Sequence, residues 1–182
     1  MEAPQNQLSK QYYWTVEELL KNTINGHQLN DFHLLTIPDG HSKAGKGVPV
    51  DYKLKELVLY FWKNNFITCG WNQGYDDIRE TPIYREETDQ WLQNNKAFIS
   101  FKGVLTNGGD AYDCLKKILY DNFGADNINI INLDDFPNFR KADDKIKNYI
   151  INEPNKLVLE IYGKYIFLVF NKSFIESMHC AL

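Results

Sequence analysis

The sequence predicts an α/β fold, with α+β as the alternative class: helices packed on a mixed β-sheet of about six strands that includes a C-terminal β-hairpin. Strand-like and helix-like segments alternate along most of the chain. Two β-prone runs, 157–162 and 165–170, are separated only by a Gly-Lys pair, which is the spacing of a tight hairpin. A length of 182 residues suits one domain. We therefore assign 1–11 to a flexible tail and 12–182 to a single globular domain.

The elements follow from local signals along the chain. Thr15 and Glu18 form a capping box for a first helix over 15–24. The clearest helix follows a cap at Asp51, because its apolar residues recur at the spacing of one helical face. Those residues are Leu54, Leu57, Val58, Phe61 and Trp62. The other expected elements are strand 32–37, loop 38–49, strand 66–69, loop 70–80, helix 81–92, strand 97–101, helix 110–123 between Asp110 and Gly124, strand 127–133, helix 141–151 and a short helix capped by Ser173.

Composition limits the classes of function. Hydrophobic residues make up 43% of the chain, which is enough for a core, and the net charge of -4 argues against a broad nucleic-acid-binding surface. The sequence shows no apolar run of about 18 residues and no signal peptide. Three cysteines at wide spacing form neither a disulfide framework nor a zinc motif. We therefore expect a soluble protein of the cytosol, without a membrane partner, cofactor or metal.

Residues 40–47 partly match a phosphate-binding loop, G-x-x-x-x-G-K. Gly47 occupies the position that should supply a hydroxyl group for Mg²⁺, and Val48-Pro49 block the helix that should hold the phosphates. We therefore expect a surface loop. A looser anion-binding loop that uses Lys43 and Lys46 is the alternative.

Other reactive residues have simpler interpretations. His33, Asp39 and His41 are close in sequence, but their spacing matches no established metal site. Cys69 ends a buried strand and could be a nucleophile, yet no histidine is placed by the sequence to activate it. We expect structural or solvated roles for these residues, and turn or cap roles for the paired aspartates.

The segment 70–77 gathers an indole, two amides, a phenol and two carboxylates after a predicted strand. Such side chains can stack on a ligand and form directional hydrogen bonds with it. The alternative is that Trp71 covers the core while Asn72 and Gln73 form turns.

Residues 47–75 also carry a recognisable pattern. A Val50-Asp51 start leads through the leucine-spaced helix to Phe61-Trp62 and then to the turn Gly70-Trp71-Asn72-Gln73-Gly74. This pattern resembles a segment found in uncharacterised proteins of giant DNA viruses. The resemblance implies a viral origin. It also implies that Trp71, Asn72 and Gln73 belong to one motif, but it implies no activity.

Together these features lead us to expect a non-enzymatic binding or interaction module of a large DNA virus, in the host cytoplasm or the virion. Its partner would be a viral or host protein or a small ligand. One alternative is an enzyme acting on a phosphate-bearing substrate through loops 40–47 and 70–77; another is single-stranded nucleic-acid binding, which the net charge disfavours. The candidate binding residues are Trp71, Asn72, Gln73, Tyr75, Asp77, Lys43, Lys46 and His41, and no catalytic residue is assigned.

Overall fold

The computed structural model describes residues 32–73, 95–136 and 139–182. The chain divides into two compact units, Met1–Lys55 and Glu56–Leu182. The predicted tail and the helices expected over 15–24 and 81–92 lie outside the described residues, and the single domain over 12–182 stays a prediction.

The described part of the first unit is a two-stranded antiparallel sheet. Strand β1 (Phe32–Thr36) pairs with β2 (Gly47–Asp51). The loop predicted over 38–49 is therefore wrong at its C-terminal end, where residues 47–49 belong to β2. Val48 and Val50 are both buried and flank Pro49, so the segment has the period-two pattern of a short strand. Proline is tolerated there because a strand of a two-stranded ribbon has one side without a ladder.

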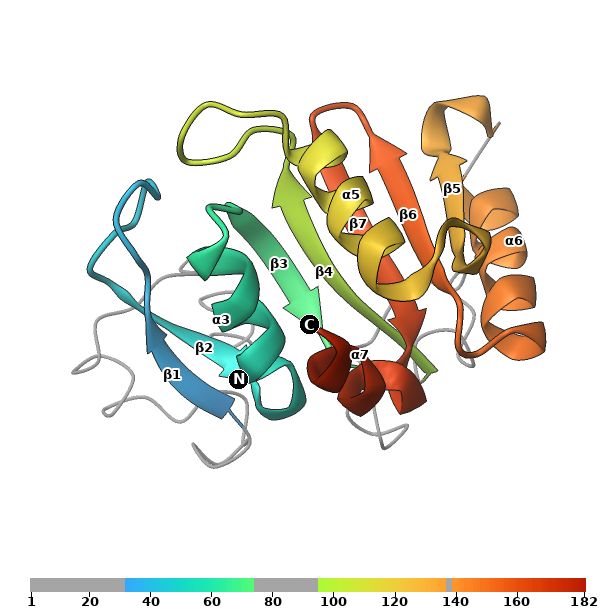
Figure 1. Ribbon diagram of the computed structural model, residues 1–182, viewed down its shortest axis with the longest axis horizontal. Coiled ribbons are helices and arrows are strands. Elements are labelled where there is room, and N and C mark those ends of the chain that lie inside the picture. The colour runs from blue at the N-terminus through green and yellow to red at the C-terminus, as the bar shows by residue number, and fades with distance from the viewer. Residues whose placement is uncertain (1–31, 74–94, 137–138) are drawn as a thin grey trace, which may run out of the picture. The chain divides into compact units, whose positions relative to one another are not determined.

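The second unit contains a five-stranded mixed sheet in the order β3-β4-β7-β6-β5 (Figure 1). Its strands are β3 (Thr68–Asn72), β4 (Lys96–Lys102), β5 (Ile128–Asn132), β6 (Leu157–Tyr162) and β7 (Tyr165–Asn171). All neighbouring strands are antiparallel except β5 and β6, which are parallel. This arrangement confirms the mixed α/β class and the C-terminal hairpin, while the first predicted strand pairs outside this sheet.

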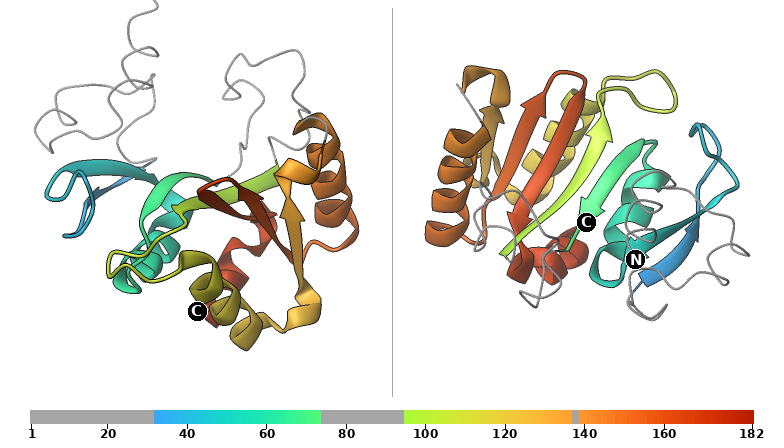
Figure 2. Two further views of the ribbon diagram at one scale, coloured as in Figure 1. Left: turned by 90° about the horizontal axis from the view of Figure 1, so that it is seen from above. Right: turned by 180° about the vertical axis from the view of Figure 1, so that it is seen from behind.

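Helices cover both faces of this sheet (Figures 1 and 2). Helices α3 (Lys55–Lys63), α5 (Ala111–Phe123) and α7 (Ile175–Ala181) lie on one face, and α6 (Phe139–Asn152) lies on the other. In the described residues, no helix has the length and apolar character needed to cross a bilayer.

The apolar stripe predicted for α3 and the turn before it is confirmed, because its five apolar residues are all buried. The ring of Phe61 lies edge-on to the rings of Phe66 and Phe101, with centroids 5.4 and 4.8 Å apart. The indole Nε1 of Trp62 donates a hydrogen bond to Thr68 Oγ1 at 2.7 Å. These contacts fix α3 against the start of β3 and the end of β4.

The predicted ends of α5 are also confirmed. The Asp110 side chain accepts a hydrogen bond from the backbone N–H of Asp113 at 2.8 Å, as an N-cap does. Gly124 ends the helix at a φ of 84°, a conformation that favours glycine. The last helix differs from the prediction, because α7 begins after Phe174, whose side chain makes no cap hydrogen bond. The cap lies earlier, at the 3-10 turn Lys172–Phe174, where the Asn171 side chain accepts from the Ser173 N–H at 2.9 Å.

A second apolar cluster lies on the α6 face of the sheet. Ile146 and Ile150 of α6 pack with Ile131, Val158 and Val169 from the three strands β5, β6 and β7. This confirms the inward positions predicted for the two isoleucines of α6. Because Ile131 belongs to this cluster, the edge strand β5 is anchored to the apolar cluster on the α6 face of the sheet.

Candidate binding surfaces

Trp71 and Asn72, which were predicted in a loop, form the end of strand β3. Trp71 pairs with Ile99 and Asn72 with Phe98, so their side chains point to opposite faces of the sheet. Both side chains are half-buried, as is Gln73 directly after the strand. The expected loop therefore begins later than position 70, and Tyr75 and Asp77 lie outside the described residues.

Strand β3 is irregular at Cys69. The pairing shifts between Thr68 and Gly70, which places a β-bulge at the cysteine. The thiol is half-buried, and burial raises its pKa above the ordinary value, although the charge of Lys102 partly opposes this rise. A raised pKa keeps the sulfur protonated, whereas a nucleophilic cysteine needs the thiolate. This supports the structural interpretation of Cys69.

The loop that resembles a phosphate-binding loop connects two antiparallel strands. Its ends are joined by hydrogen bonds from Ile37 N–H to Lys46 O and from Gly45 N–H to Ile37 O, both 2.9 Å. Strand β2 follows the loop, so the helix N-terminus that holds phosphates in a P-loop is replaced by a strand. Lys43 and Lys46 are exposed and His41 is half-buried. The looser anion-binding role stays a prediction.

The candidate metal ligands have other surroundings. His33 stacks on Tyr52 with ring centroids 5.2 Å apart, which supports a structural role for this histidine. Across the three described ranges, no group of three or more His, Cys, Asp or Glu side chains is arranged to hold a metal ion.

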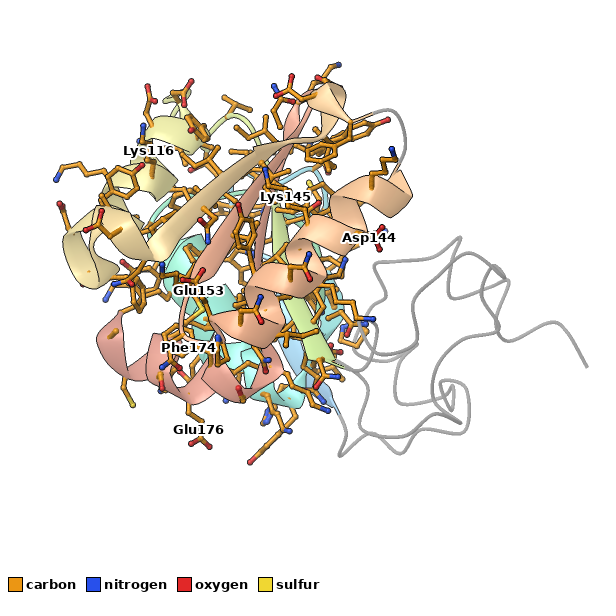
Figure 3. All side chains as sticks on the ribbon, turned by 90° about the vertical axis from the view of Figure 1, so that its right-hand side faces the viewer. Lys116, Asp144, Lys145, Glu153, Phe174 and Glu176 are labelled. Atoms are coloured by element: carbon orange, nitrogen blue, oxygen red, sulfur yellow. The ribbon has the colours of Figure 1, made fainter. Side chains whose placement is uncertain are left out.

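The surface that sequence reasoning missed is the β5 edge, Ile128–Asn132, at the end of the sheet (Figure 3). All five residues pair in regular parallel register with Leu157–Ile161 of β6. Within the described residues no strand pairs with the other side of β5. An edge strand presents backbone N–H and C=O groups on that side, and proteins commonly protect such edges with charges, prolines or bulges. The β5 sequence Ile-Asn-Ile-Ile-Asn contains none of these.

The side chains of β5 divide between anchoring and exposed positions. Ile128 and Ile131 are 8% and 2% exposed and hold the strand to its neighbours, whereas Ile130 is 40% exposed. The side-chain Nδ2 of Asn129 is buried without an acceptor in the described part of the chain. The edge therefore combines a fixed backbone with one exposed apolar side chain and one unused donor.

Acidic side chains lie just beyond both ends of β5. Asp126 precedes the strand, and Asp134 and Asp135 follow it; all three are exposed. None of these three carboxylates forms an ion pair with another described residue. The nearby lysines have other partners. Lys156 Nζ lies 2.7 Å from Glu153 Oε1, and Lys117 Nζ lies 2.6 Å from Asp121 Oδ2. The ammonium group of Lys145 lies over the Phe136 ring.

The comparisons with known proteins do not assign the chain to a family. No protein-family model, curated protein or solved structure matches the chain.

Proposed function

We propose that the protein is a non-enzymatic interaction module that binds an extended segment of another protein by adding it as a strand along the β5 edge. The observation that carries this proposal is a regular, uncharged edge strand with no partner on its outer side in the described residues. Strand addition uses main-chain hydrogen bonds for affinity and alternate side chains for specificity.

The edge is suited to this role because its backbone is already ordered. Ile128 and Ile131 are buried, and Ile131 belongs to the α6 core cluster. A preformed strand loses little conformational freedom on binding, so most of the ordering cost falls on the incoming segment. Burial of Ile130 would add a hydrophobic contribution, since it is 40% exposed in the free chain.

The expected affinity is modest. A short ladder of about four main-chain hydrogen bonds, each with a net contribution of about 1 kcal/mol, gives roughly 4 kcal/mol. Because association also costs several kcal/mol of translational and rotational freedom, the ladder alone gives a dissociation constant of about 1 mM or weaker. A natural partner would raise the affinity through contacts beyond the strand or through a second attachment.

The biological setting belongs to the same proposal. The resemblance of residues 47–75 to proteins of giant DNA viruses supports a viral origin, and hence action in the host cytoplasm or the virion. The partner would then be a viral or host protein.

The test is an NMR titration with an uncharged peptide that has a Thr-Val-Thr-Val-Thr core. Ile130→Lys places a charge on the edge and should weaken binding by at least about tenfold. Ile151→Lys is the matched control, because Ile151 is 48% exposed but lies on α6, and its affinity should equal that of the wild type. Equal binding by all three proteins, or no binding by any, would contradict the proposal.

A further inference from the structure

The charges at the two ends of β5 determine which extended segment fits this edge. We infer that its partner is a segment of a different protein with Lys or Arg residues on both sides of its β-forming centre, and not a second copy of this chain. This inference rests on the proposed function, because it names the occupant of the same edge.

The position of the acids argues against pairing between two copies. In an antiparallel pair centred on Ile130, the turn that holds Asp126 in one copy would approach the turn that holds Asp134 and Asp135 in the other, at both ends of the ladder. In an in-register parallel pair, each acidic turn would approach its own counterpart. Like charges brought close together at the ends of a ladder oppose strand pairing. Both symmetric arrangements therefore meet repulsion at both ends of β5.

The same acids favour a basic partner. Asp126 lies at one end of β5, and Asp134 and Asp135 lie at the other, so a bound segment five residues long would place its flanking residues near them. The backbone N–H of Asp134 donates to Asn132 Oδ1 at 3.1 Å, which fixes the start of the acidic turn relative to the strand. Lys116 lies over aromatic rings of its own helix, α5, and Lys145 of α6 lies over the Phe136 ring next to the acidic turn (Figure 3).

This arrangement explains how an unprotected edge remains selective. The uncharged centre accepts any strand-forming backbone, whereas the acidic ends repel acidic segments and other copies of the chain. Placing the charges outside the ladder leaves the main-chain hydrogen bonds undisturbed. Specificity would therefore reside in the residues that flank the bound strand.

Three peptides with the same Thr-Val-Thr-Val-Thr core test the inference: one with lysine pairs at both ends, one with serine pairs and one with glutamate pairs. At low salt the lysine peptide should bind about three- to tenfold more tightly than the serine peptide, and the glutamate peptide most weakly. The difference between the peptides should shrink at about 0.5 M salt, where exposed charges are screened.

Two variants locate the effect. In the triple variant Asp126→Asn, Asp134→Asn, Asp135→Asn, the three peptides should bind with equal affinity. Asp144→Asn removes an exposed acid from α6, away from the ends of β5, and should leave the preference for lysine unchanged.

The possible results separate the two proposals. Equal binding of all three peptides to the wild type would overturn the inference while leaving strand addition intact. Absence of binding by every peptide would overturn strand addition itself. Sedimentation of the wild type as a dimer that Ile130→Lys dissociates would show that a second copy occupies the edge, and would also overturn the inference.

Discussion

The two edges of the five-stranded sheet are built differently. Strand β3 contains a bulge at Cys69, and its end carries the Trp71 and Asn72 side chains that the sequence singles out. Strand β5 pairs with β6 without interruption and carries only Ile and Asn. An irregular edge resists the addition of another strand, and a regular uncharged edge permits it. The comparison shows that unusual composition and an available backbone are separate properties, found here at opposite ends of one sheet.

The largest expected effect concerns the anchoring of β3. Trp62→Ala should lower the free energy of unfolding by about 3–5 kcal/mol, because it removes a buried aromatic ring and the partner of Thr68 Oγ1. Trp71→Ala should cost about 1–3 kcal/mol, since that side chain is only half-buried. Urea denaturation of both variants measures the difference, and equal losses would contradict this description of the β3 edge.

A similar division is expected within β5. Ile131→Ala should cost about 2–5 kcal/mol, because Ile131 is 2% exposed and belongs to the α6 core cluster. Ile130→Ala should cost less than about 1 kcal/mol, because that side chain is 40% exposed. If chemical denaturation gave the opposite order, the exposed side chain would be part of the core and unavailable to a partner.

The smallest effect concerns the bulge in β3. Burial raises the pKa of the Cys69 thiol in the folded chain, so between the ordinary and the raised pKa the unfolded chain releases its proton first. Stability should therefore be intact below the ordinary thiol pKa and should decrease as the pH rises toward the folded value.

A Cys114→Ser, Cys180→Ser variant leaves Cys69 as the one thiol for this measurement. The rate of Cys69 alkylation rises with pH as the thiol loses its proton. This rise should occur at a higher pH in the folded state than in urea. Identical pH profiles in the two states would contradict a buried, protonated thiol.

Local signals predict α3, α5, α6 and the hairpin well. The spacing of Leu57, Phe61 and their neighbours gives α3, and Asp110 with Gly124 gives the ends of α5, because caps and amphipathic faces depend on residues within a few turns. The Gly163-Lys164 pair gives the hairpin for the same reason.

Features that depend on distant pairing could not be predicted. The glycine at position 70 indicated a loop, yet pairing with Ser100 extends β3 through it. Strand β2 was missed because Pro49 is acceptable only where a strand lacks a partner on one side. The position of β5 at an edge depends on the order of all five strands, which periodicity does not contain.

Hydrogen exchange at the two edges shows directly whether a bound segment adds to β5. The lysine-flanked peptide is added at about 1 mM, and the exchange of backbone amides is followed in Ile128–Asn132 of β5 and in Thr68–Asn72 of β3. We expect slower exchange in β5, no change in β3, and loss of the β5 effect in Ile130→Lys. Protection of β3, or unchanged exchange in β5 while the peptide binds, would contradict this expectation.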